Sequence, residues 1–170
     1  TLVLKGNLTD YLNGTYGLIL NTTMFVNQSH PYTGTYMLYV FLERQHYENQ
    51  TLTISITVLE VVMLAVAQPN DLTMIWGYEE NITIYYNRSR DGKFIQGATL
   101  TTTSTPQATG AFTVIEETGR YILNINSTQL NDSQTYTVNI TLQKTFYQTK
   151  TVIVTITVQT IPTVASSSLS

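Results

Sequence analysis

The feature that most restricts the fold of this chain is a segment that recurs after 100 residues with the same alternation of side chains. Residues 35–42 (TYMLYVFL) align with 135–142 (TYTVNITL). The match continues without a gap, at a constant offset of 100 residues, as far as Val58 and Val158. A second match, at an offset of 105, joins 14–23 to 119–128. A period near 100 residues is the size of a β-sandwich domain, not of a solenoid repeat. The chain is therefore predicted to contain two related domains.

The matched segments alternate with a period of two, which turns one face of each strand inward. β-Branched and aromatic residues fill the inward positions, and turn signals such as Asp91-Gly92 and Thr109-Gly110 separate the strands. This pattern predicts an all-β fold of tandem antiparallel β-sandwiches. The side chains predicted to face the core of the second domain are Ile82, Ile84, Tyr86, Tyr121, Leu123, Ile125, Tyr136, Val138, Ile140, Leu142, Val152, Val154, Ile156 and Val158.

The two copies differ in completeness. Residues 1–62 match only the C-terminal part of a sandwich, residues 63–160 form the complete copy, and 161–170 read as a flexible Ser-rich tail. The apolar run 58–67 is far shorter than the ~20 residues of a membrane-spanning helix. We interpret it as the last strand of one copy passing almost directly into the first strand of the next, a stiff joint.

N-glycosylation motifs are unusually dense. Ten of the twelve asparagines stand in Asn-X-Ser/Thr triplets without a central proline. With Ser and Thr at about a quarter of positions, chance predicts roughly three. We expect an extracellular surface that carries many N-glycans, because these groups are bulky, solubilising and confined to exposed positions. The acceptor residues are Asn7, Asn13, Asn21, Asn27, Asn49, Asn81, Asn87, Asn126, Asn131 and Asn139.

Composition is consistent with such a surface. Charged residues make up 11% of the chain, well below the usual quarter, so Thr, Asn and Ser must supply the polar surface. A net charge of −3 gives no basic footprint for nucleic acid. Cysteine is absent, which excludes disulfides and thiolate metal sites. No cofactor is expected beyond covalent N-glycans.

Catalytic constellations are poorly supported. The histidines, His30 and His46, stand in a predicted loop and a predicted turn, and no triad order or HExxH spacing is present. The pairs 79–80 and 116–117 are adjacent glutamates expected at solvated edges. Asp91 could contact Ca²⁺, but neighbouring arginines would repel a cation. We therefore predict no enzyme activity and no metal site.

The second copy resembles the immunoglobulin-like tandem repeats of large archaeal cell-surface proteins, especially Asgard ones, which are related to bacterial Ig-like adhesin domains. The resemblance rests on 81–87, 95–100, 119–123, 134–142, 146–147 and 151–158. It implies stacked domains displayed outside the membrane, without a family active site. The family places Gly-Tyr before the last strand, whereas this chain has His46-Tyr47 and Phe146-Tyr147. That departure leaves the conformation of the turn open.

The missing part of the first copy must be replaced, because open strand edges and a bare apolar layer are not tolerated. The strands come either from preceding sequence of a longer polypeptide or from another subunit by β-strand addition. Met37, Tyr39 and Phe41 are apolar where the second copy has Thr137, Asn139 and Thr141. They pack under loop 27–34 or a neighbouring domain, or they form a partner interface.

These features predict a non-catalytic, heavily N-glycosylated structural protein of the cell surface, such as a coat, S-layer, stalk or filament subunit. Its expected partners are neighbouring domains or identical subunits, without nucleic acid and without membrane insertion by this segment. The alternative is an adhesin or carbohydrate-binding module, which would use Trp76, Tyr78, Tyr85 and Tyr86 as a sugar platform.

Overall fold

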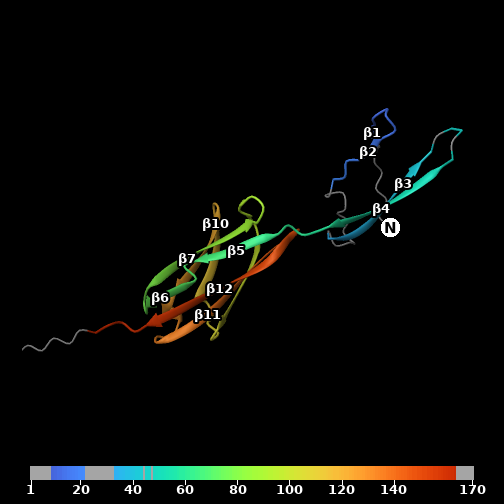
Figure 1. Ribbon diagram of the computed structural model, residues 1–170. Helices are drawn as coiled ribbons and strands as arrows, with labels where there is room; N and C mark the ends of the chain where they lie inside the picture. The colour runs from blue at the N-terminus through green and yellow to red at the C-terminus, as the bar shows by residue number, and fades with distance from the viewer. Residues whose placement is uncertain (1–8, 22–32, 44, 47, 164–170) are drawn as a thin grey trace, which may run out of the picture. The chain divides into compact units, whose positions relative to one another are not determined.

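The computed structural model describes residues 9–21, 33–43, 45–46 and 48–163. The chain divides into two compact units, Thr1–Glu60 and Val61–Ser170. Apart from a single 3-10 turn at Ser127–Gln129, the part of the chain that the structure describes is built from strands and loops (Figure 1).

The second unit is a sandwich of two four-stranded sheets. One sheet has the order β5-β7-β10-β9, and the other has the order β6-β12-β11-β8. The strands are β5 (Met63–Gln68), β6 (Asp71–Ile75), β7 (Glu79–Arg88), β8 (Thr99–Thr105), β9 (Phe112–Glu117), β10 (Arg120–Asn126), β11 (Gln134–Lys144) and β12 (Tyr147–Gln159). The predicted all-β sandwich is confirmed.

The core of this unit follows the predicted alternation. All fourteen side chains expected to face inward are at most 7% exposed, and most of them are fully enclosed. Their neighbours along each strand point to the surface, as the burial pattern of β11 and β12 shows. Full burial of side chains of this size stabilises a fold by about 1.5–3 kcal/mol each before chain entropy is counted, so this layer holds the two sheets together.

Strand order and one hydrogen bond give the sandwich its immunoglobulin-like character. The order corresponds to ABED facing A′GFC, and the A′ strand β6 pairs with β12 in parallel, from Thr155↔Asp71 to Gln159↔Ile75. This pairing is the one parallel ladder between the named strands and was not predicted. Near the start of β11, the hydroxyl of Tyr136 accepts a hydrogen bond from the Asn131 backbone N–H, 2.9 Å away. Such a contact is the tyrosine corner of these domains.

The first unit contains the counterpart of one hairpin. Strands β3 (Gly34–Leu42) and β4 (Gln50–Val58) pair from Gly34↔Val58 to Leu42↔Gln50, the register of β11 with β12 shifted by 100 residues. Even a side-chain contact recurs: threonine hydroxyls face each other across Thr35 and Thr57 at 3.2 Å and across Thr135 and Thr157 at 3.1 Å. Two short strands, β1 (Thr9–Asp10) and β2 (Tyr16–Gly17), form a further antiparallel pair.

One residue of the turn before the last strand takes the same conformation in both units. His46 has φ 70° and Phe146 has φ 75°, so both residues take the left-handed conformation. That conformation favours glycine, which explains why the resembling family has glycine at this position.

The apolar run 58–67 spans the end of one strand and the start of another. β4 ends at Val58 and β5 begins at Met63. Between them, Val61 pairs in parallel with Tyr147, and its N–H donates to the Phe146 carbonyl at 2.8 Å. Among the described residues, no helix is long and apolar enough to cross a membrane. Residues 1–8, at the start of the incomplete first copy, lie outside the described residues.

Candidate functional site

The asparagines of the glycosylation motifs lie at the surface wherever the structure describes them. Five are exposed: Asn13, Asn21, Asn49, Asn81 and Asn131. Three are half-buried: Asn87, Asn126 and Asn139. Asn7 and Asn27 lie outside the described residues. Asn139 alternates with the fully buried Val138 and Ile140, as the period of two predicts.

In two of the acceptor triplets, the threonine hydroxyl donates a hydrogen bond to the side-chain amide oxygen of the acceptor asparagine. The Thr15 hydroxyl donates to Asn13 Oδ1, which also accepts the Thr15 N–H at 3.1 Å. The Thr128 hydroxyl donates to Asn126 Oδ1 at 2.6 Å, and the Thr128 N–H does so at 3.0 Å. In both triplets the asparagine Oδ1 accepts the N–H two residues later, which is the Asx-turn that asparagine forms readily.

The triplet at Asn126 is also part of the fold. Its middle residue, Ser127, is fully buried, and the Ser127 hydroxyl accepts the N–H groups of Gly77 and Tyr78 at 2.8 and 2.9 Å. The same hydroxyl lies 2.7 Å from the Tyr78 carbonyl, to which it donates. Modification of Asn126 would therefore have to precede folding or leave this network intact.

Among the eight acceptor residues that the structure describes, Asn87 is the least suited to a glycan. Its Oδ1 is buried and has no hydrogen-bond partner in the part of the chain that the structure describes. The residue lies at the end of β7, where its backbone pairs with Phe94. Alternation along the strand was the available sequence signal. It did not reveal this half-burial, because it carries no information about the segments that pair with Asn87 on its two sides, at Leu64 and Phe94.

The apolar outer face of β3 is exposed. Met37, Tyr39 and Phe41 are 51%, 54% and 75% exposed, and they pair across the hairpin with Ser55, Thr53 and Thr51. None of the three is covered by described residues to the extent that a core position is. The three side chains therefore form one continuous exposed stripe along β3. Most of loop 27–34, which was the alternative expected cover, lies outside the described residues.

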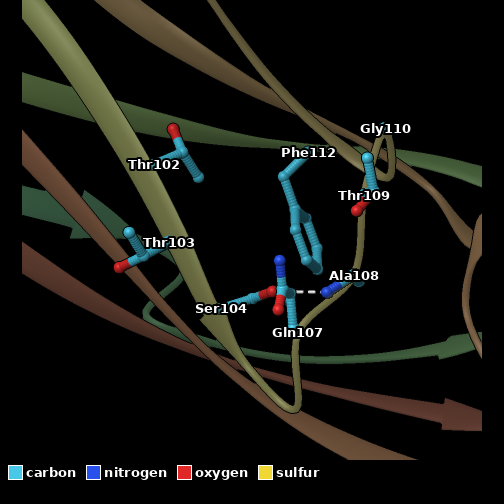
Figure 2. A pocket seen from close by; sticks show the side chains of 8 residues that line it. All are labelled: Thr102, Thr103, Ser104, Gln107, Ala108, Thr109, Gly110 and Phe112. Atoms are coloured by element: carbon cyan, nitrogen blue, oxygen red, sulfur yellow. Dashed lines mark hydrogen bonds between the residues drawn. The ribbon is translucent and has the colours of Figure 1, made fainter.

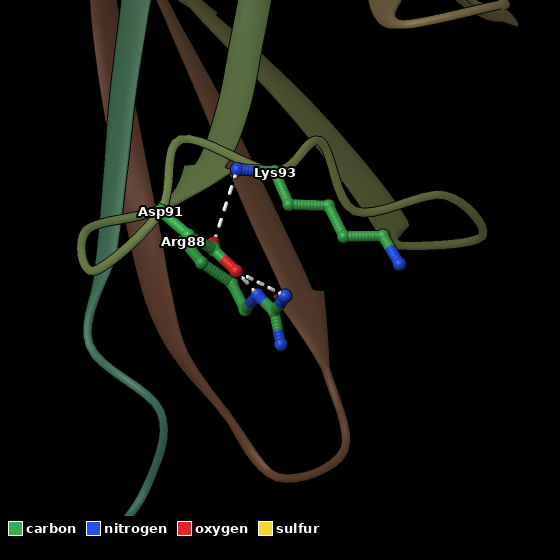
Figure 3. A network of polar contacts seen from close by, with 3 residues as sticks. All are labelled: Arg88, Asp91 and Lys93. Carbon is green, nitrogen blue, oxygen red and sulfur yellow. Dashed lines mark hydrogen bonds and ion pairs between the residues drawn. The ribbon is translucent and has the colours of Figure 1, made fainter.

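In the loop that was considered as a Ca²⁺ site, Asp91 forms an ion pair with Arg88 (Figure 3). The Arg88 guanidinium donates to both carboxylate oxygens of Asp91, with Nε 3.0 Å from Oδ1. The hydrogen bond from the Lys93 N–H is the main cause that lowers the pKa of Asp91; Arg88 adds to this effect and desolvation opposes it. The carboxylate is thus occupied by the Arg88 guanidinium and by the backbone N–H of Lys93.

The adjacent glutamates of β9 make structural contacts. Glu116 accepts the Gly97 N–H at 2.8 Å, and Glu117 pairs with Arg120 at 2.8 Å. His46 is in the hairpin turn, and His30 lies outside the described residues. Within the described ranges, no group of three His, Cys, Asp or Glu side chains could hold a metal ion.

The four aromatic residues of the alternative sugar platform do not form one surface. Tyr86 is fully buried and donates to the Gln148 carbonyl at 2.7 Å, whereas Tyr85 points to the opposite face of β7. Trp76 is 37% exposed and is held by its indole N–H, which donates to the Leu130 carbonyl at 3.1 Å. Of the four, only Trp76 and Tyr78 expose much of their rings.

A cavity opens between β8 and β9, and it was not predicted from the sequence. It has a volume of about 390 Å³, and its lining includes Thr102, Ser104, Gln107 and Phe112 (Figure 2). The signal that could have revealed it is the loss of apolar residues at the inward positions of β8 after Leu100.

Comparisons with known proteins give structural neighbours only. No family model matches the chain, and no curated protein matches it. The chain is similar to domains 4 and 5 of the S-layer protein SbsC, with 17% identity, a TM-score of 0.43 and coverage of 75% of this chain and 66% of that one. It is similar to the adhesin InvE of Yersinia pseudotuberculosis, with 20% identity, a TM-score of 0.40 and coverage of 59% and 27%. It is also similar to the titin M3 domain, with 16% identity, a TM-score of 0.39 and coverage of 59% of this chain and 92% of that one.

Proposed function

We propose that this chain is part of a non-catalytic, heavily N-glycosylated structural protein of the cell surface, of the kind that the resemblance to archaeal surface repeats implies. Its immunoglobulin-like sandwich acts as a spacer in a coat, stalk or filament, and its glycans form the hydrated outer layer. The alternative role as an adhesin would use the same surface location.

The observation that carries the proposal is the placement of the acceptor asparagines. All eight that the structure describes reach solvent at least in part, and they lie on strands as well as loops. The outward positions of β11 and β12 that alternate with the core carry threonines, glutamines, Asn139 and Ile153 instead of Lys or Glu. Because charge is scarce, covalent sugars are the natural source of hydration for this surface.

The hairpin β3–β4 supports an assembly of domains. Its inward residues, including Leu52 and Ile54, are 53% and 37% exposed, although the matching Val152 and Val154 are 7% and 0% exposed. A neighbouring domain or an identical subunit would cover this layer by β-strand addition. The extracellular location follows from the glycans and needs no further anchor in this segment.

Peptide mapping of protein isolated from its native source tests the proposal. Glycan mass is expected on the exposed Asn13, Asn49, Asn81 and Asn131, and least on Asn87, whose amide is half-buried. Peptides covering all eight described sites that carry only their bare polypeptide mass would rule the glycoprotein proposal out. The matched controls are Asn70 and Asn124, which stand outside any acceptor triplet.

A further inference from the structure

One strand of the sandwich breaks the rule that inward positions are apolar. On β8, the inward residues are Leu100, Thr102 and Ser104, whereas the facing positions of β11 in the same sheet are Leu142, Ile140 and Val138, all fully buried. A hydroxyl beside a core position is disfavoured unless it finds a hydrogen-bond partner or water. The two hydroxyls are explained by the cavity that they line.

The cavity lies where the edge strands of the two sheets diverge. In Figure 2 the ring of Phe112, at the start of β9, lies between the β8 threonines on one side and the loop residues Ala108 and Thr109 on the other. Ser104 fixes this loop, because its Oγ accepts the Ala108 N–H at 2.9 Å. The site thus has a polar wall, an aromatic wall and a loop anchored to the strand.

The polar groups of the lining are available to a ligand. The side chains of Thr102, Gln107 and Thr109 make no hydrogen bond within the part of the chain that the structure describes, and each both donates and accepts. The Ser104 hydroxyl still has its proton to donate. No described residue of the lining is charged.

We propose that this cavity binds a neutral sugar unit. Sugars present hydroxyl groups, which match the Thr, Ser and Gln side chains, together with an apolar face that packs on an aromatic ring such as Phe112. The volume of about 390 Å³ falls in the range of small-molecule sites. An anionic or cationic ligand would find no countercharge here. The site goes beyond the proposed structural role and does not rest on glycosylation of this chain.

Amide-shift titration of the full chain, produced without glycans, tests the proposal. The probes are glucose, mannose, galactose and N-acetylglucosamine. At least one is expected to give saturable shifts at Thr102, Ala108 and Gly110, with a Kd on the order of 1 mM, as expected of a ligand of about a dozen heavy atoms. The anionic glucuronic acid and the cationic glucosamine should bind no more tightly than these neutral sugars, because the lining has no charged residue. Shifts that stay linear well above that concentration, or that spread over the surface, would overturn the proposal.

Matched variants locate the site. Thr102→Val keeps the shape of the side chain and removes its hydroxyl, so binding should weaken roughly two- to tenfold, the value of one hydrogen bond. Thr101→Val, on the outward face of the same strand, is the control and should bind like the parent chain. Gln107→Ala, in the exposed loop, provides a second variant if Thr102→Val does not fold. Equal weakening by Thr101→Val and Thr102→Val would count against the cavity.

Natively glycosylated chain then identifies the source of the sugar. If it self-associates and the best free sugar disperses it, the ligand is a glycan of a second copy. If it remains monomeric and binds immobilised glycans in competition with that sugar, the ligand is foreign. Both results support the site. If the sugar bound in the titration competes in neither assay, the proposal fails.

Discussion

The hairpins β3–β4 and β11–β12 share a register and differ in what covers them. Leu142 is fully buried, whereas its counterpart Leu42 is only half-buried, and Phe41 is 75% exposed where the second copy has a threonine. Both hairpins keep their strands, their threonine pair and their left-handed turn. Strand formation in this chain is therefore a local property of the sequence, whereas burial depends on an opposing sheet.

The outward faces extend the comparison. In the second copy, the outer residues of β11 are Thr135, Thr137, Asn139 and Thr141, which suit a hydrated surface. In the first copy, three of these four positions carry Met37, Tyr39 and Phe41. Aromatic and Met side chains are enriched at the centres of interfaces. The outward face of β3 is therefore exposed and apolar, whereas the matching face of β11 is polar.

Separate production of the two units should give the largest effect. Residues 61–170 are expected to unfold cooperatively, because their core is closed. Residues 1–60 should show no cooperative transition, since an open apolar layer cannot offset the conformational entropy of folding. Circular dichroism during thermal and urea unfolding measures both. A monomeric, cooperative transition of residues 1–60 would show that this unit closes its own core.

Equivalent leucines provide the next test, in the full chain. Leu142→Ala is expected to lower the free energy of unfolding of the second unit by about 2–5 kcal/mol, because it leaves a cavity in a closed core. Leu42→Ala should leave that transition unchanged. Urea denaturation followed by Trp76 fluorescence reports on the second unit. Equal losses from both substitutions would mean that the two units share one core.

Replacing the apolar stripe with threonine, the residue at two of the three matching positions of the second copy, sharpens the contrast between the outward faces. In the chain with Met37→Thr, Tyr39→Thr and Phe41→Thr, self-association should weaken about tenfold or more if the stripe is an interface, as hot-spot aromatics contribute at least 2 kcal/mol. Sedimentation velocity over a range of concentrations measures this. Thr137→Ser with Thr141→Ser, on the equivalent face, is the control. Unchanged association of the triple variant would remove the stripe from the interface.

The shared turn should give the smallest effect. The left-handed conformation costs a residue other than glycine about 1–2 kcal/mol, and glycine in turn loses about 0.5–1 kcal/mol of chain entropy. Phe146→Gly is therefore expected to stabilise the second unit by up to about 1 kcal/mol in urea denaturation. Phe146→Ala keeps the strain and serves as the control. Marked destabilisation by Phe146→Gly would show that the ring of Phe146 contributes more than its backbone strain costs.

Much of the fold could be predicted from particular residues. The period of two in 134–142 and 151–158 correctly placed Val138 and Val154 in the core. The glycines of the predicted turns, Gly92 and Gly110, have φ of 67° and 80°. The parallel strand β6 was not predicted, because its five residues reveal neither their partner nor their direction.

The candidate sites were predictable to a smaller extent. Acceptor triplets are read directly from the sequence, and alternation placed Asn139 on the outward face. It could not show that Asn87 Oδ1 is buried or that Ser127 anchors Gly77 and Tyr78. The two Ser127 contacts join residues 50 and 49 positions apart, and a period of two within one strand carries no information about such distant partners. The cavity beside Phe112 likewise depends on two sheets meeting.

The sequence by itself determined the strands, their inward faces, the turns and the repeat, because each depends on neighbours within a few residues and on the two-residue period of a strand. The tertiary structure alone decided which of the two matching hairpins is closed, where Thr102 and Ser104 line a cavity and how far each acceptor asparagine reaches solvent. These properties depend on which surfaces meet across the sandwich. Contacts between sheets are long-range, so no periodicity within a strand encodes them.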